Sequence, residues 1–203
     1  KNRMTHHWIL VLLAIILVSC GKYPENIYVV PEKASMVTAL DVGGMGLKGK
    51  FYNIKSWESY SSIIEKLKKT NNSLADFIEY IAEHPFQTGV DYGADLFVFY
   101  EDLGMGKRYI GTSIKVSDQE DLKKLIAYYY DSKQQQVELK EEGGVSLVVS
   151  NNEVLGYDKE KLLVLTPISR VNNAELLIHM KVLFGLKKEQ SIVNNENFQG
   201  FYK

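Results

Sequence analysis

The chain has 203 residues, of which 45% are hydrophobic and 24% are charged, and its formal net charge is −1. This length suits one domain or a compact pair of domains, and it allows a core to be buried without disulfide or metal staples. The near-neutral charge and the absence of a basic stretch argue against a nucleic-acid partner.

The first 19 residues carry the features of a secretory signal peptide. Lys1 and Arg3 precede an apolar run over residues 8–18, and small residues follow it. A basic start, a short apolar region and a small-residue cleavage point define such a peptide. A membrane-spanning helix needs about 20 apolar residues, so the run is too short to be one. We therefore predict a lipoprotein signal peptide over residues 1–19.

Cys20 is the only cysteine, and it stands directly after this segment. The stretch "LVSC", residues 17–20, resembles the bacterial lipobox, which implies that the Cys20 thiol receives diacylglycerol and that cleavage occurs before it. Each buried CH₂ contributes about 0.8 kcal/mol, so two or three palmitate-like chains anchor a protein durably in a membrane. Lipidation would leave no thiol for catalysis, zinc binding or a disulfide. The alternatives are a buried free cysteine and an uncleaved hydrophobic anchor.

Residues 20–34 are expected to form a lipid-proximal tether, because "GKYPENIYVVPEK" contains two prolines and no helical period. An α+β domain would then span residues 35–203. Its first strand is predicted over residues 36–42, where "MVTALDV" is rich in apolar and β-branched residues.

Two amphipathic helices are predicted next, because apolar residues recur at spacings of three and four over residues 57–67 and 74–81. Ser73 is expected to cap the second helix, and Pro85 to end it. A hairpin follows, with strands over residues 96–100 and 109–116 around a glycine-containing turn.

Ser117 and Glu120 form a predicted capping box for a third helix, in which Tyr129 belongs to the apolar face while Tyr128 and Tyr130 point elsewhere. Further strands are predicted over residues 137–140, 145–150, 154–157 and 162–166. A last long helix is expected to begin at Asn172 or Asn173.

This order of elements predicts an α+β fold, with a mostly antiparallel sheet and helices packed on one face. Four stretches in this order also resemble an uncharacterised family of Bacteroidota-type lipoproteins classed as a domain of unknown function: "VVPEKASMVTALDV", "TGVDYGADLFVFY", "YIGTSIKVSDQEDLKKLI" and "DKEKLLVLTP". The resemblance implies an envelope lipoprotein and brings no catalytic residue with it. Members are usually longer, which raises the expectation that the domain is truncated at its C-terminal end.

No catalytic constellation is found by sequence, and no catalytic, cofactor-binding or metal-binding residue is predicted. His84 and His179 stand apart without the spacing of a metal site, and they are interpreted as helix-terminal or surface residues. The glycine clusters at residues 43–49 and 104–111 match no phosphate-binding motif. Acidic residues gather around the predicted hairpin, where they are expected to be solvated.

The prediction is therefore a lipid-anchored cell-envelope protein of unknown activity, whose domain binds or scaffolds a protein or glycan of the envelope. The membrane itself is the expected partner of Cys20. Gly21, which stands where an aspartate would act as a retention signal, indicates the outer membrane. Whether the protein faces the periplasm or the cell surface stays open. The alternative function is an envelope hydrolase acting on glycan or peptide.

Overall fold

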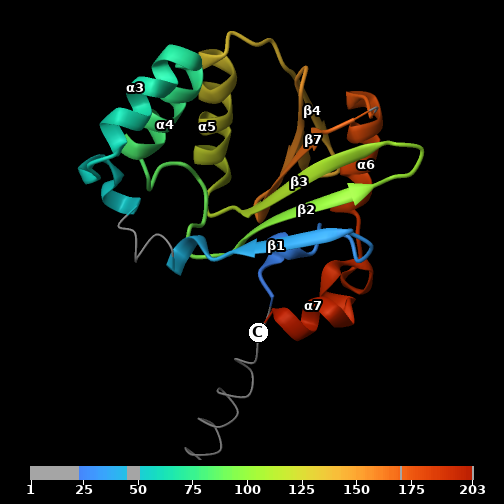
Figure 1. The fold of residues 1–203 in the computed structure, drawn as a ribbon. Helices are drawn as coiled ribbons and strands as arrows, with labels where there is room; N and C mark the ends of the chain where they lie inside the picture. The colour runs from blue at the N-terminus through green and yellow to red at the C-terminus, as the bar shows by residue number, and fades with distance from the viewer. Residues whose placement is uncertain (1–22, 45–50, 170, 203) are drawn as a thin grey trace, which may run out of the picture.

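The structure is a computed structural model that describes residues 23–44, 51–169 and 171–202 (Figure 1). Seven strands form one antiparallel sheet in the order β1-β2-β3-β7-β6-β5-β4. The strands are β1 (Met36–Leu40), β2 (Leu96–Asp102), β3 (Arg108–Lys115), β4 (Glu138–Glu142), β5 (Val145–Val149), β6 (Val154–Tyr157) and β7 (Lys161–Pro167). The α+β class and the antiparallel sheet are thus confirmed.

The helices lie before, between and after these strands. The longer ones are α3 (Tyr60–Thr70), α4 (Asn72–Glu83), α5 (Gln119–Ser132) and α6 (Asn173–Phe184). The shorter ones are η1 (Glu25–Ile27), η2 (Phe51–Ser56), η3 (Lys188–Gln190), η4 (Ile192–Asn194) and α7 (Glu196–Phe201). The predicted hairpin corresponds to β2 and β3, and the predicted late strands to the meander from β4 to β7.

The helices cover both faces of the sheet, so the prediction of one covered face is wrong. On one face, α6 packs through Leu176, Met180 and Leu183 on a cluster that includes Phe99 and Leu165. On the other face, α4 and α5 pack on a separate cluster of buried residues: Val148, Leu155, Tyr157 and Leu162. All four residues of β6 are buried, so this strand needs cover on both sides. Figure 1 shows α6 on the side of the sheet away from α3, α4 and α5.

The predicted tether is wrong over its described part, because most residues from Asn26 to Pro31 are buried in the core. Ile27 and Val30 are fully buried in the α6 cluster. The Val30 carbonyl accepts a hydrogen bond from the Ile192 amide at 2.8 Å, which ties this segment to the C-terminal turns. The two prolines and the missing helical period reflect an irregular segment that is nevertheless packed, because apolar side chains are buried wherever the fold offers them cover.

The helix caps differ in two of three places from the prediction. Asn71, not Ser73, caps α4 by accepting from the Leu74 amide at 3.0 Å. Asp118, not Ser117, caps α5. The cap of α6 is confirmed at Asn172, which forms a reciprocal capping box with Glu175. A shift of one or two residues is ordinary, because several neighbouring side chains can supply the oxygen that an N-terminus needs.

The tyrosine assignment in α5 is also corrected. Tyr130 is buried and donates to Glu153 at 3.2 Å, while Tyr129 is only partly buried. Tyr128 stacks on Tyr80 of α4 with ring centroids 4.1 Å apart. The helix therefore turns more of its surface toward its neighbours than a single apolar stripe predicts.

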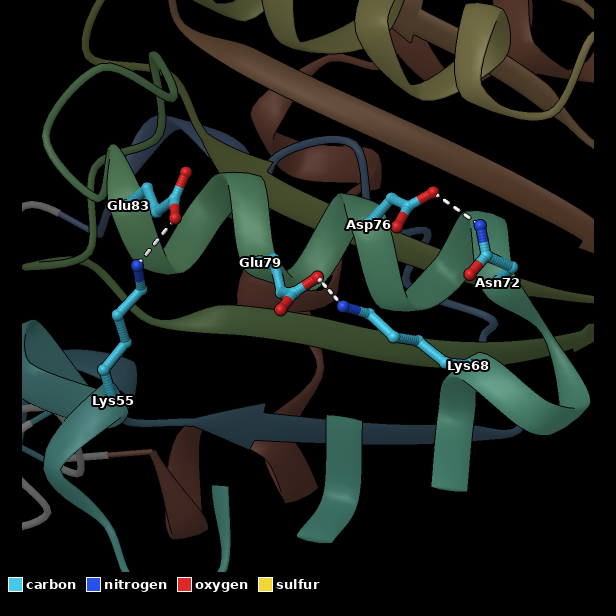
Figure 2. Close-up of polar contacts among 6 residues, drawn as sticks. All are labelled: Lys55, Lys68, Asn72, Asp76, Glu79 and Glu83. Carbon is cyan, nitrogen blue, oxygen red and sulfur yellow. Dashed lines mark hydrogen bonds and ion pairs between the residues drawn. The ribbon is translucent and has the colours of Figure 1, made fainter. Parts of the chain in front are cut away.

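The outer side of α4 is held to the preceding elements by ion pairs (Figure 2). Lys68 of α3 lies 2.8 Å from Glu79, and Lys55 of η2 lies 2.7 Å from Glu83. These side chains are partly exposed, so the pairs contribute little net stability and mainly fix how η2 and α3 lie along α4.

Candidate functional site

The predicted lipidation site, Cys20, lies outside the described residues. The described part of the chain contains another grouping of ionisable side chains, built from three elements. Glu101 of β2 and Tyr109 of β3 are direct partners in the register of the hairpin. His179 reaches them from α6. We name Glu101, Tyr109 and His179 the acid–histidine cluster.

Hydrogen bonds connect all three members of the acid–histidine cluster. The Tyr109 hydroxyl donates to Glu101 Oε2. His179 Nε2 lies 3.0 Å from the same carboxylate oxygen and 2.8 Å from the Tyr109 hydroxyl oxygen. Because the tyrosine proton is engaged with Glu101, both oxygens are left as acceptors for a proton on Nε2. The arrangement therefore assigns the Nε2-protonated form of His179.

Burial and hydrogen bonding together set the electrostatics of the cluster. The exposed fraction of the side chain is 14% for Glu101 and 18% for His179, and Tyr109 is fully buried. Burial, with the neighbouring Glu101 charge, raises the pKa of Tyr109, so its hydroxyl stays protonated. Burial alone would raise the pKa of Glu101 as well. The hydrogen bonds from His179 and Tyr109 outweigh it and hold the Glu101 pKa below its ordinary value.

The start of α6 is held over the hairpin turn, which keeps the cluster aligned. Lys107, in the turn between β2 and β3, lies 2.5 Å from Glu175 in the first turn of α6. Ser169 Oγ donates to the Gly106 carbonyl at 2.6 Å, so the segment before α6 is attached to the same turn. His179 follows Glu175 by about one helical turn, so it faces the same hairpin.

The sequence was interpreted as placing His179 at a helix end or on the surface, whereas His179 lies within α6 and contacts the buried Tyr109 and the half-buried Glu101. A predicted hairpin register could have placed Glu101 opposite Tyr109. No local signal could have brought His179 to them, because it is 70 residues from Tyr109 along the chain. His84, in contrast, ends α4 as expected, and its ring lies 5.0 Å from that of Tyr80.

The acidic residues around the hairpin do not converge. Asp91 pairs with Lys115 at 2.8 Å, Asp102 pairs with Arg108 at 3.0 Å, and Asp95 accepts from the Tyr202 hydroxyl. Within the described ranges, no group of three or more histidine, cysteine or acidic side chains is placed to hold a metal ion.

A hollow of about 310 Å³ lies at the other end of β2 from the acid–histidine cluster. It is lined by Pro24, Gly93, Ala94, Asp95, Lys115 and Tyr202. None of these residues belongs to the acid–histidine cluster. The hollow and the cluster are therefore separate features.

A third feature is a part of the sheet that no described helix covers. Strand register places Met36, Tyr100 and Ile110 side by side on the face opposite Phe99, and Leu40 lies on this face too. Met36 is 58% exposed, Leu40 39% and Ile110 38%. The helices on this face pack on β5, β6, β7 and the end of β3 at Ile114. We name this region, formed by β1, β2 and β3, the open sheet face.

Among the residues that the structure describes, no helix is both long enough and apolar enough to cross a bilayer. Comparison with curated proteins and with solved structures finds no significant match. Residues 25–203 match the family described as "Domain of unknown function (DUF4836)". This match spans most of the chain and includes every strand of the sheet. The chain therefore belongs to the DUF4836 family of domains of unknown function.

Proposed function

We propose that this protein is a lipid-anchored component of a bacterial cell envelope whose α+β domain binds or scaffolds another envelope component. The observation that carries the anchor is the position of the lipobox-like stretch, with Cys20 at its end, immediately before the family domain that starts at residue 25. We further propose that the protein is a lipoprotein of the Bacteroidota type. Gly21 after the cysteine supports a location in the outer membrane.

The distance between the anchor and the domain makes this proposal more specific. Among the residues that the structure describes, the first fully buried one is Asn26, six residues after Cys20. A fully extended chain spans at most about 3.5 Å per residue, so an acylated Cys20 would hold the core within roughly 20 Å of the bilayer surface. The domain would therefore act close to the membrane rather than at the end of a long tether.

The binding role is supported by the open sheet face. Exposed large apolar side chains gathered on one sheet face, here Met36, Leu40 and Ile110, are typical of an interaction site. The acid–histidine cluster, by comparison, is enclosed between the sheet and α6, and the hollow lies elsewhere. A partner is therefore more readily placed on β1, β2 and β3 than a small substrate is placed beside Glu101.

Intact mass of the membrane-extracted protein tests the anchor. The wild-type mass should correspond to a chain that begins at Cys20 and carries two or three acyl groups. The Cys20→Ala variant should lack both the acyl mass and the cleavage. An unmodified, uncleaved chain in both proteins would contradict the proposal, because residues 1–19 would then act as an ordinary hydrophobic segment.

An envelope hydrolase is the second candidate, and the acid–histidine cluster is the observation that favours it. A carboxylate that fixes the tautomer of an imidazole is the arrangement used in general-base catalysis. Hydrolysis of envelope glycan or peptide by the wild-type protein, lost in both Glu101→Gln and His179→Asn variants that remain folded, would establish this function. Activity that persists in these variants would exclude the cluster as its site.

A further inference from the structure

The two edges of the sheet differ sharply in charge. Within the described part of the chain, β4 pairs only with β5, and β1 pairs only with β2. Four of the five residues of β4, "ELKEE", are charged, and all five are exposed. Strand β1, "MVTAL", has no charge and no proline, and four of its five residues are exposed. Charged edge strands resist pairing with other chains, whereas neutral and flat ones permit it.

Self-pairing distinguishes these edges further. If two copies of β4 paired antiparallel about their central residue, Lys140 would lie opposite Lys140 of the second copy and Glu138 opposite its Glu142. Like charges placed directly opposite destabilise a strand pair. If two copies of β1 paired in the same way, Thr38 would lie opposite Thr38, and Met36 opposite Leu40 of the second copy. These contacts are uncharged and self-complementary.

The exposure of Ala39 indicates that the β1 edge is open. Its register partner on β2 is Phe97, which is fully buried on the α6 face of the sheet. Ala39 itself is exposed although its side chain lies on that same covered face. The cover on this face therefore reaches Val37, which packs against the core, but does not extend over Ala39.

We propose that a second copy of this chain adds to the sheet through β1, by antiparallel β1–β1 pairing centred on Thr38. The pairing is two-fold symmetric, so it closes after two copies, and the charged β4 edges remain at both ends of the joined sheet. The two open sheet faces become continuous across the new strand pair, which brings Met36 of one copy beside Leu40 of the other.

Disulfide trapping tests this pairing because the chain has a single cysteine to remove. In a Cys20→Ala background, Thr38→Cys should form a disulfide-linked dimer at twice the 23.1 kDa of the chain on a non-reducing gel. Opposed residues of antiparallel strands have Cα atoms about 4.5–5.5 Å apart. Disulfides span about 4.4–6.8 Å between Cα atoms, so the geometry is compatible.

Two matched variants serve as controls. Met36→Cys lies on the same exposed strand, but about 14 Å from its own copy, because four residues at about 3.4 Å separate the two positions. Lys140→Cys lies at the centre of the opposite edge. Neither variant should form a disulfide-linked dimer under the oxidation that links Thr38→Cys. Equal linkage in all three variants, or linkage of Thr38→Cys to a different protein, would overturn the proposal.

Sedimentation in density-matched detergent provides an independent readout. The Cys20→Ala chain should sediment as a dimer, and an added Thr38→Lys substitution should convert it to a monomer with an unchanged circular dichroism spectrum. A monomer before that substitution would also overturn the proposal. The inference extends the proposed binding role but does not depend on the anchor, because every variant lacks Cys20. Its failure and the failure of acylation are therefore measured separately.

Discussion

Removal of the Tyr109 hydroxyl is the perturbation that tests the acid–histidine cluster most directly. Tyr109→Phe keeps the buried ring and deletes only the group that donates to Glu101. A hydrogen bond to a charged acceptor contributes about 1.5–3 kcal/mol. His179 Nε2 still lies 3.0 Å from the carboxylate, so Glu101 is not left unpaired. We expect the free energy of unfolding to fall by about 2 kcal/mol at pH 7, which corresponds to roughly 4–8 °C in Tm for a domain of this size.

The pH dependence of the stability difference between the wild type and Tyr109→Phe is a second test of the cluster. The pKa of Glu101 is lowered in the folded state, so its contribution to stability is fully present above the unfolded pKa of about 4.3. That contribution is lost as the pH falls through the lower folded pKa. Without the Tyr109 hydroxyl the folded pKa is lowered less, so the variant loses less stability on acidification. The difference between the two proteins should therefore shrink as the pH falls.

Urea unfolding followed by circular dichroism, at neutral and acidic pH, measures both quantities. The control is Glu101→Gln, alone and combined with Tyr109→Phe, in a double-mutant cycle. Deleting the hydroxyl should cost less when the charged acceptor is absent. An equal cost of Tyr109→Phe with and without Glu101, or a cost that stays constant as the pH falls, would refute the argument.

Two packing predictions are checked by the same unfolding assay. Gly111→Ala should lower the free energy of unfolding by about 1–3 kcal/mol, because the new methyl group would lie within 2.6 Å of Phe99 ring atoms. Its control, Gly200→Ala, should leave that free energy unchanged or raise it slightly, because no atom lies within 4 Å of the added methyl group. Met180→Ala should cost about 2–5 kcal/mol because the side chain is fully buried, while Ile178→Ala on the exposed side of the same helix should stay within about 0.5 kcal/mol. Equal effects within either pair would contradict the packing described.

Local patterns in the sequence predicted most of the helices and strands, because each element is marked by residue types and spacings within a few positions of one another. The hairpin of β2 and β3 follows from two apolar strands around glycine residues, and the start of α6 follows from the capping asparagines, Asn172 or Asn173. The caps of α4 and α5 were misplaced by one or two residues, since neighbouring polar side chains compete for the same backbone amides. The segment at Ile27 was misjudged because an irregular packed segment has no periodic signal.

By itself, the sequence determined the signal-like segment, the single cysteine, the α+β class and the order of strands and helices, because each depends on residue type and near-neighbour spacing. Only the tertiary structure decided that β7 lies against β3, that helices cover both faces, and that His179 meets Glu101. It also decided which strands lie at the two edges. These outcomes depend on which apolar surfaces from distant parts of the chain pack against one another. Local sequence patterns do not specify those partners, because burial involves the whole folded chain.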